Sequence, residues 1–294
     1  MTFIRFRPAV CAAALALALV AAPLLPAQAA GTLDRIAETG VFTIGYRTGE
    51  PPMSFADPDG QPAGYSVDLC RVVAEEARLD LGLESLDIRY LAVTAEDRFD
   101  KIASGEIDIL CGVTTRTLTR AATVGFSQLT FATGGALLSM DDGDRIERLS
   151  DLAGRKVAVG AGTSTLEILA GKLQAGGVAA EIVQMDSADA SIAALLAGEV
   201  DAYAADQVVL VGKVLSQTDA SLSYFIAGDL FSFEPLALAH AHGDVAFQLV
   251  ADRALSRLYR SGAVLKIYEN WFGAFGQAPT AAQRALWQLG STPE

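Results

Sequence analysis

A glycine-rich turn near the middle of the sequence could bind a small anion. Lys156 to Gly160 reads as a strand, and Gly160-Ala161-Gly162 leads from it into a helical pattern that starts at Thr163 or Ser164. The start of a helix presents free backbone N–H groups and the positive end of the helix dipole, which favour a negative charge. Position 165 is Thr where a dinucleotide fingerprint needs a third glycine, and no lysine follows in the P-loop pattern. The turn therefore suits a small carboxylate rather than a nucleotide, although an ordinary helix cap without a ligand would use the same residues.

The overall charge makes buried or clustered arginines informative. The formal net charge is −13 at pH 7, which disfavours nucleic acid and anionic membranes as partners. A site for an acidic ligand in such a chain needs its own cations, because a carboxylate buried without a partner is strongly disfavoured. No Cys, His and carboxylate residues have zinc spacing, so we expect neither a metal nor another cofactor.

The N-terminus has the order of segments found in a secretory signal peptide. Arg5 and Arg7 precede an apolar run from Ala9 to Val20, and Ala27-Gln28-Ala29 matches the small-residue cleavage site. We therefore predict a signal peptide over residues 1–29 and a periplasmic mature chain. A membrane anchor is the alternative, which the short apolar run argues against.

The mature chain keeps two cysteines, Cys70 and Cys111. Export would allow them to form a disulfide. Two buried thiols acting as small apolar residues would explain them equally well. Both interpretations stay open on the sequence alone.

Short β-branched runs alternate with longer amphipathic runs along the mature chain. Predicted strands cover residues 41–45, 88–92, 107–111, 156–160, 181–184 and 200–203, and predicted helices cover residues 66–78, 97–104, 164–174, 187–197, 244–259 and 262–272. This alternation predicts βαβ units and a mostly parallel sheet, which is an α/β fold.

A series of short motifs in a fixed order resembles a known family. The motifs are Gly45-Tyr-Arg47, Pro52-Met-Ser-Phe55, Gly64-Tyr-Ser-Val-Asp68, Gly105-Glu-Ile-Asp108, Thr114-Thr115-(x)4-Arg120, Gly162-Thr-Ser164, Gly198-Glu-Val-Asp-Ala202 with Asp206, and Lys266-Ile-Tyr-(x)2-Trp-Phe-Gly273. Together they resemble the family 3 periplasmic solute-binding proteins of ABC importers for polar amino acids. Within that family, Arg47, Thr94-(x)3-Arg98 and Cys111-Gly-(x)-Thr-Thr are most similar to the glutamate/aspartate-binding proteins.

The resemblance implies the type II periplasmic binding protein fold, in which two α/β lobes are joined by two hinge strands. Residues 30–131 and 237–294 would form the first lobe and residues 134–232 the second, with hinges near 131–134 and 232–236. The ligand would lie in the cleft and be buried when the hinge closes. The implied partners are a small amino acid and the permease subunits of an ABC transporter, and we expect a monomer that binds no nucleic acid.

The resemblance also assigns roles to residues on both sides of the cleft. Arg120 would hold the α-carboxylate of an amino acid, because a guanidinium group makes two parallel bonds to a carboxylate. Thr115 and the backbone at Val113 would add hydrogen bonds. From the second lobe, Thr163 and Ser164 at the helix start would face the same carboxylate.

The other end of the ligand and its side chain have their own predicted partners. Asp206, which follows the predicted strand 200–203, would bind the α-ammonium group. Arg47 and Arg98 would meet a second anionic group on the ligand. The predicted ligand is therefore an acidic amino acid such as glutamate or aspartate.

The chain departs from the glutamate/aspartate binders at three positions. Ala95 and Val113 stand where those proteins have serine, and a ligand-contacting histidine is replaced near Ala188. Each lost neutral hydrogen bond is worth roughly 0.5–1.5 kcal/mol. A larger ligand, a different dicarboxylate and a neutral polar amino acid therefore remain open.

Two other functions would fit the same resemblance. Some proteins with this fold are lyases acting on cyclic dicarboxylates, in the manner of cyclohexadienyl dehydratase, and a lyase needs a general acid or base in its cleft. Glu50 is the carboxylate in the loop from Arg47 to Pro52, and its residue type favours a solvent-facing position. A sensor that docks on a receptor is the other alternative. We predict a binding protein and not an enzyme.

Overall fold

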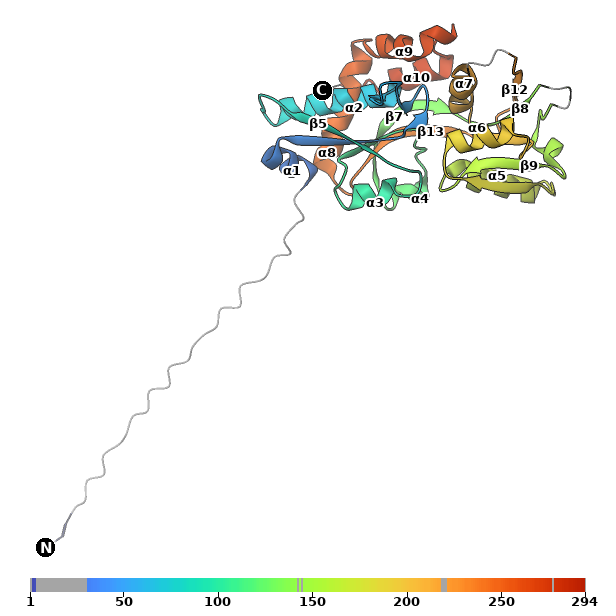
Figure 1. The fold of residues 1–294 in the computed structure, drawn as a ribbon. Coiled ribbons are helices and arrows are strands. Elements are labelled where there is room, and N and C mark those ends of the chain that lie inside the picture. The colour runs from blue at the N-terminus through green and yellow to red at the C-terminus, as the bar shows by residue number, and fades with distance from the viewer. Residues whose placement is uncertain are drawn as a thin grey trace. The chain divides into compact units, whose positions relative to one another are not determined.

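A five-stranded mixed sheet organises what we call the first lobe (Figure 1). The structure, a computed structural model, describes residues 2–3, 31–141, 143, 145–217, 221–276 and 278–293. The sheet order is β5-β1-β6-β13-β7, with bounds Asp87–Ala92, Val41–Tyr46, Ile109–Cys111, Glu234–His240 and Gly125–Thr133. Strand β1 is parallel to β5 and β6, but β13 is antiparallel to both β6 and β7. The predicted α/β alternation is therefore present, and the expectation of a mostly parallel sheet is only half right.

Helices from both ends of the chain pack on this sheet. They are α1 (Thr32–Thr39), α2 (Tyr65–Asp80), α3 (Arg98–Ala103), α4 (Leu118–Ala121), α8 (Val245–Arg260), α9 (Val264–Phe272), the short 3₁₀ helix η2 (Gly273–Phe275) and α10 (Ala281–Leu289). Helix α2 buries Cys70, Val73 and Ala77 at helical spacing, which gives it one apolar face. That face shares a core with the buried side chains of Ile44 on β1 and Phe247 on α8. The strands β2 (Gly49–Glu50), β3 (Ser54–Ala56) and β4 (Pro62–Ala63) form a small separate sheet beside it.

A second five-stranded sheet organises what we call the second lobe. Its order is β10-β9-β11-β8-β12, with bounds Glu181–Met185, Lys156–Gly160, Ala202–Asp206, Gly135–Met140 and Tyr224–Ile226. The 3₁₀ helix η1 (Leu149–Leu152) precedes β9, and the helices are α5 (Ser164–Ala175), α6 (Ala188–Leu196) and α7 (Gln207–Leu215). Strand β9 is parallel to β10 and β11, which places the loops after β9 and β11 at the same edge of the sheet.

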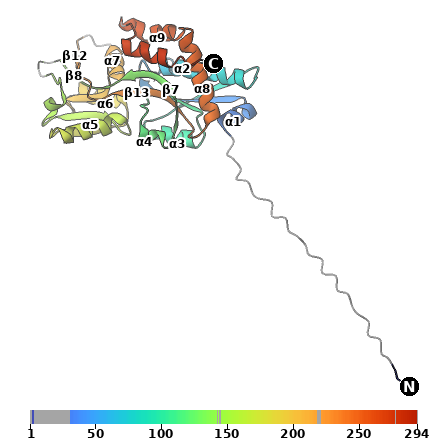
Figure 2. The same ribbon diagram turned by 180° about the vertical axis from the view of Figure 1, so that it is seen from behind.

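Strands β7 and β13 connect the two sheets, and both views of the ribbon show them running between the lobes (Figures 1 and 2). The chain leaves the first sheet after Thr133 and starts β8 at Gly135, and it returns between Phe231 and Glu234. A Cβ atom at Gly134 would lie 2.2 Å from the carbonyl oxygen of Ser232, so only glycine fits where the two crossings touch. These crossings give the molecule a narrow connection about which the lobes can turn. The residue numbers predicted for the lobe boundaries remain a prediction.

Two features tie the first lobe together near its contact with the second. Cys70 on α2 and Cys111 on β6 form a disulfide, with their Cα atoms 6.3 Å apart. Gln283 on α10 bonds the free edge of β7, since its Nε2 donates to the carbonyl of Thr130 (3.1 Å) and its Oε1 accepts from the N–H of Ala132 (3.3 Å). The sheet on which the cleft is built is thus braced at the end nearest the crossing.

The predicted signal peptide lies outside the described residues, apart from Thr2 and Phe3. By inter-residue contacts, residues 31–294 separate from residues 1–30 as a unit of their own. Within the described part of the chain, every helix is too short or too polar to cross a membrane.

Candidate functional site

A cavity of about 50 Å³ lies between the two lobes. First-lobe residues in its wall are Arg47, Glu50, Ala95, Arg98, Val113, Thr114 and Arg120, and second-lobe residues are Gly160, Ala161, Thr163, Ser164, Asp186, Ser187, Ala188, Tyr203, Ala204, Ala205, Asp206 and Val209. Small-molecule sites usually offer a few hundred Å³. A ligand with a side chain therefore needs the two walls to move apart before it can enter.

Arg120 reaches the cavity from the short helix α4. The hydroxyl of Thr117 caps this helix by accepting from the Arg120 N–H, which fixes the backbone from which the side chain extends. The guanidinium Nη1 donates to the carbonyl of Thr115 (3.1 Å), and its carbon lies 5.5 Å from the centre of the Phe99 ring. Burial lowers the pKa of Arg120, and the carboxylates of Glu167, Glu234 and Asp206 oppose that shift. Arg120 thus lies partly desolvated, with most of its hydrogen-bonding edge not used by the protein.

Asp206 faces the same cavity from the second lobe. It ends strand β11 and precedes α7, but its side chain does not cap that helix. The residue is only 9% exposed, and its Oδ1 atom is buried without a hydrogen-bond partner in the described part of the chain. Burial raises the pKa of Asp206 well above its usual value, and the nearby carboxylates of Glu234 and Glu50 raise it further. The positive charge of Arg120 opposes this shift, but among the described residues no cation forms an ion pair with this carboxyl group.

The start of helix α5 forms a polar contact with the first lobe. Thr163 is its N-cap, with an Oγ1 that donates to the carbonyl of Gly160 and accepts from the N–H of Leu166. Ser164 Oγ lies 3.0 Å from Thr115 Oγ1 and 3.1 Å from Glu234 Oε2. The side chains predicted to bind the ligand here are thus occupied by protein partners, which leaves the backbone N–H groups of the turn as its anion-binding feature.

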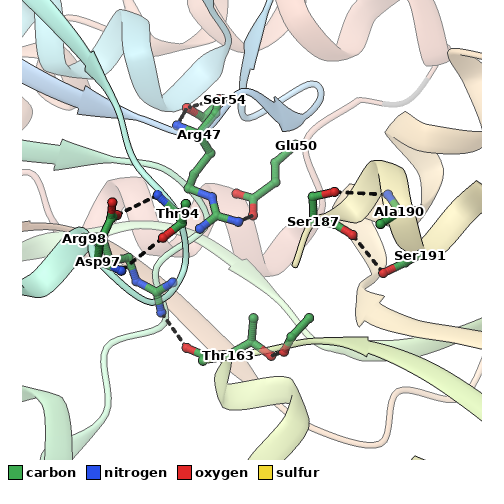
Figure 3. Close-up of polar contacts among 12 residues, drawn as sticks. Arg47, Glu50, Ser54, Thr94, Asp97, Arg98, Thr163, Ser187, Ala190 and Ser191 are labelled. Atoms are coloured by element: carbon green, nitrogen blue, oxygen red, sulfur yellow. Dashed lines mark hydrogen bonds and ion pairs between the residues drawn. The ribbon is translucent and has the colours of Figure 1, made fainter. Parts of the chain in front are cut away.

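Arg47 and Glu50 form an ion pair inside the cavity, at the end of β1 and on β2. Arg47 Nη2 lies 3.0 Å from Glu50 Oε1, and the two side chains are 11% and 15% exposed. Figure 3 shows their charged ends facing each other, with Ser187 at the start of α6 on the far side of Glu50. Arg47 Nη1 and Glu50 Oε2 are both buried without a hydrogen-bond partner among the described residues. The expectation that Glu50 faces solvent was therefore wrong, because the loop after β1 folds inward over the cleft.

Arg98 bridges the two lobes. Its Nη2 donates to the carbonyl of Gly162 across the cleft (3.0 Å; Figure 3), while its Nε is buried without a partner among the described residues. The guanidinium carbon lies 4.6 Å from the Phe99 ring centre, and the residue is 4% exposed. Burial, followed by the positive charges of Arg120 and Arg47, lowers the pKa of Arg98 to about 9. In this closed arrangement one edge of Arg98 serves lobe closure instead of a ligand.

Close backbone contacts accompany that bridge. A Cβ atom at Gly212 on α7 would lie 1.9 Å from the carbonyl oxygen of Pro51, and one at Gly162 would lie 3.1 Å from that of Ala95. Gly162 also has a φ of +67°, which glycine adopts without strain. The lobes touch at both ends of the cavity through positions where a side chain does not fit.

The structure brings together nearly all of the predicted ligand residues. Arg47, Arg98, Val113, Arg120, Thr163, Ser164 and Asp206 line the cavity, as do Ala95 and Ala188, the positions that depart from the glutamate/aspartate pattern. Thr115 is 3% exposed and lies behind the wall, while its neighbour Thr114 lines it.

Several wall or near-wall residues were missed by sequence reasoning, among them Glu234, Tyr203 and Ser187. Glu234 is fully buried behind the cavity, Tyr203 lies on β11, and Ser187 caps α6. The alternation of β11 does not indicate Tyr203, because residues three apart on a strand point to opposite faces, and nothing in the local sequence indicates Glu234. No three Cys, His or carboxylate side chains of the described residues group as metal ligands would.

Comparison with known proteins places the chain in a family. Residues 42–274 match the bacterial extracellular solute-binding proteins, family 3. A Pseudomonas aeruginosa L-glutamate/L-aspartate-binding protein is 33% identical over 91% of this chain and 88% of its own length. A Salmonella typhimurium glutamate/aspartate import solute-binding protein is 30% identical over 84% of this chain and 81% of its own length.

Solved structures agree with the sequence relatives. An ancestral arginine-binding protein bound to glutamine matches with a TM-score of 0.70 and 29% identity, covering 80% of this chain and 98% of that one. The predicted two-lobed, type II periplasmic binding protein fold is therefore confirmed, as is the resemblance read from the motifs. The chain belongs to the bacterial extracellular solute-binding proteins of family 3.

Proposed function

We propose that this protein captures an α-amino acid between its lobes and delivers it to an ABC importer. The observation that carries the proposal is the placement of Arg120 and Asp206 in one cavity, on opposite lobes. Asp206 is buried and its Oδ1 has no partner among the described residues, while the half-buried guanidinium of Arg120 donates through one nitrogen to the carbonyl of Thr115. An α-amino acid supplies both missing partners in one small molecule.

The chemistry of the two ends follows from these partners. The α-carboxylate would lie against the guanidinium of Arg120, which offers two parallel N–H groups, and against the N–H groups at the start of α5. The α-ammonium would neutralise Asp206 and donate to its Oδ1. Because these contacts come from both lobes, the ligand stabilises only the closed form, which is a shift of population toward closure.

The side chain of the ligand would lie toward Arg47, Arg98 and the start of α6. The relatives from P. aeruginosa and S. typhimurium are named for glutamate and aspartate, and the two additional arginines support an acidic amino acid here too. The family and the predicted signal peptide together support the periplasm as the compartment and permease subunits as the partner. A monomer suffices for this role, because both walls of the cavity belong to one chain.

A thermal-unfolding panel tests the proposal. Wild-type protein is heated with L-glutamate, L-aspartate and L-glutamine, and with glutarate and 4-aminobutyrate, which lack the α-ammonium and the α-carboxylate respectively. A ligand present at about a hundred times its Kd adds about 2.7 kcal/mol to the free energy of unfolding. We expect stabilisation by at least one intact amino acid and none by the truncated compounds. Failure of every L-amino acid, or equal stabilisation by glutarate, would contradict the proposal.

The same cavity supports binding without chemical conversion. Glu50, the carboxylate considered for a lyase, is held in an ion pair with Arg47. One oxygen of this carboxylate is therefore occupied by a protein partner, 3.0 Å away. Chromatography of a cyclic dicarboxylate incubated with the protein should therefore recover it unchanged, and product formation would overturn this part of the proposal.

A further inference from the structure

Glu50 is a carboxylate inside a cavity proposed to receive an acidic ligand. Its side chain is 15% exposed and pairs with Arg47 at 3.0 Å, while its second oxygen, Oε2, is buried without a hydrogen-bond partner among the described residues. The backbone leaves room for the pair, since a Cβ atom at Gly112 would lie 2.9 Å from Arg47 Cγ and 3.9 Å from Glu50 Oε2. The ion pair is therefore packed into the wall and is not a surface contact.

The charges of the wall nearly cancel before any ligand enters. Arg47, Arg98 and Arg120 supply the positive charges, and Glu50, Asp186 and Asp206 supply the negative charges, with Glu234 buried directly behind. The α-ammonium and α-carboxylate of an amino acid would pair with Asp206 and Arg120. Because these two ligand charges cancel, the net charge of the site would not change. A second carboxylate on the ligand would then be an additional negative charge next to Glu50, in a site shielded from water.

The unused atoms of the pair offer one donor and one acceptor. Arg47 Nη1 has N–H groups without an acceptor, and Glu50 Oε2 is an acceptor without a donor. A side-chain carboxylate can accept from Arg47 but repels Glu50. A side-chain carboxamide has a carbonyl oxygen for Arg47 and an NH₂ group for Glu50, so it can meet both without adding charge.

We propose that Glu50 is a specificity-determining residue that admits a side-chain carboxamide, that of glutamine or asparagine, and disfavours a second carboxylate. This inference rests on the proposed function and concerns the distal end of the same site. The chain thus captures an amide amino acid together with the acidic class, and Glu50 sets the ratio of the two affinities.

The test compares L-glutamine and L-glutamate by titration calorimetry on four proteins. These are the wild type, Glu50→Gln, which removes the charge and keeps the shape, Glu50→Asp, which keeps the charge, and Glu84→Gln as a control at an exposed glutamate. Thermal unfolding of each variant without ligand checks that it is folded. We expect Glu50→Gln to shift the affinity ratio toward glutamate by at least about tenfold, because a like charge leaves a low-dielectric site. Glu50→Asp and Glu84→Gln should keep the wild-type ratio within about threefold.

Different failures have different meanings. If the wild type binds either ligand and the ratio in Glu50→Gln stays at the wild-type value, the role of Glu50 is refuted and the proposed function stands. An equal shift in Glu50→Asp and Glu50→Gln would refute it too, because shape and not charge would then set the ratio. If no L-amino acid binds the wild type, the proposed function itself fails.

Discussion

The carboxyl group of Asp206 is in an unfavourable environment in the ligand-free protein. Burying a carboxylate without a cation is unfavourable, and here burial and two neighbouring carboxylates raise the pKa of Asp206 well above its usual value. No residue of the described chain donates to its Oδ1 atom. We propose that an ammonium group of the ligand offsets this cost when it binds.

Replacing Asp206 should separate stability from binding. Asp206→Asn keeps the shape of the side chain but replaces the carboxyl group with an amide, which carries no charge and takes up no proton. We expect the ligand-free protein at neutral pH to unfold at the same temperature or a higher one, because a carboxyl with a raised pKa destabilises the folded state above the pKa of the unfolded chain. Amino-acid binding should fall by at least about a hundredfold, since a buried charged partner is lost.

Thermal unfolding and calorimetry measure both effects. Asp229→Asn, at an exposed aspartate, is the matched control and should change neither. An Asp206→Asn protein that is clearly destabilised without ligand, or that binds as well as the wild type, would contradict this account of the residue.

The raised pKa of Asp206 also predicts how binding depends on pH. An ammonium group needs the ionised carboxylate, whereas the ligand-free site favours the protonated form at low pH. Affinity should therefore fall as pH decreases through the raised pKa of Asp206, by up to about tenfold per pH unit below it. Binding in that range should release a proton.

Calorimetry in buffers with different ionisation enthalpies measures that proton directly. In glutamine titrations the ligand side chain does not ionise, so the proton can be assigned to the protein. A constant affinity across the range, or proton uptake instead of release, would show that Asp206 does not meet the ammonium group.

The residue scale also shows what sequence reasoning can and cannot find. Arg120 and Asp206 follow motifs, and their positions in the cavity were predictable from the order of those motifs. The ion pair between Arg47 and Glu50 was not, because it depends on the loop after β1 folding inward rather than on spacing. Arg98 was predicted to bind a ligand, and its bond to the carbonyl of Gly162 could only be seen with both lobes in place.

At the scale of elements, helix α10 bonds the edge strand β7 next to the point where the chain crosses between the lobes. β7 lies at the edge of its sheet, so its outer N–H and C=O groups need partners other than a strand. Gln283 supplies them at Thr130 and Ala132, immediately before the chain leaves the first lobe. Helix α10 lies beyond residues 42–274, the segment that the family model matches.

Removing that brace should weaken the first lobe. Gln283→Ala leaves the N–H of Ala132 without its partner, whereas the carbonyl of Thr130 keeps the hydroxyl of Tyr65 (3.1 Å). A buried group left unsatisfied costs roughly 1–3 kcal/mol, and this N–H is partly buried, so we expect a loss toward the lower end of that range. Chemical denaturation should show a decrease of that size.

The matched control lies on the same helix. Gln288 is exposed, so Gln288→Ala should change the free energy of unfolding by less than about 0.5 kcal/mol. Equal stabilities of Gln283→Ala and the wild type would mean that β7 does not depend on α10.

The elements themselves were largely predictable, and the exceptions have a physical reason. Periodicity found strands β1, β5, β6, β9, β10 and β11 and helices α2, α3, α5, α6, α8 and α9 to within a few residues, but it did not find β8, β12, α1, α7 or α10. The strands that connect the lobes, β7 and β13, carry no such pattern along their whole length, since they pass from one core to the cleft. Their antiparallel pairing, with irregularities near Leu236 and Ala237, depends on contacts distant in the sequence.

At the scale of the whole molecule, closure is built from contacts that need no ligand and from charges that do. Arg98 reaches Gly162, and Gly212 lies against Pro51, so the lobes fit closely when closed. Asp206, by contrast, keeps its Oδ1 without a partner among the described residues in that closed form, and Arg120 donates to one carbonyl, that of Thr115. We propose that the first set makes closure possible and that the second makes it favourable only around an amino acid.

Titration of L-glutamate into the wild type, Arg120→Ala and Arg116→Ala tests this account most directly. Arg116 is exposed near the same turn and serves as the matched control. We predict that Arg120→Ala lowers the affinity by at least about a hundredfold, because the α-carboxylate loses its bidentate partner, while Arg116→Ala stays within about threefold of the wild type. Equal binding of L-glutamate by Arg120→Ala and the wild type would contradict the central claim that Arg120 holds the ligand across the cleft from Asp206.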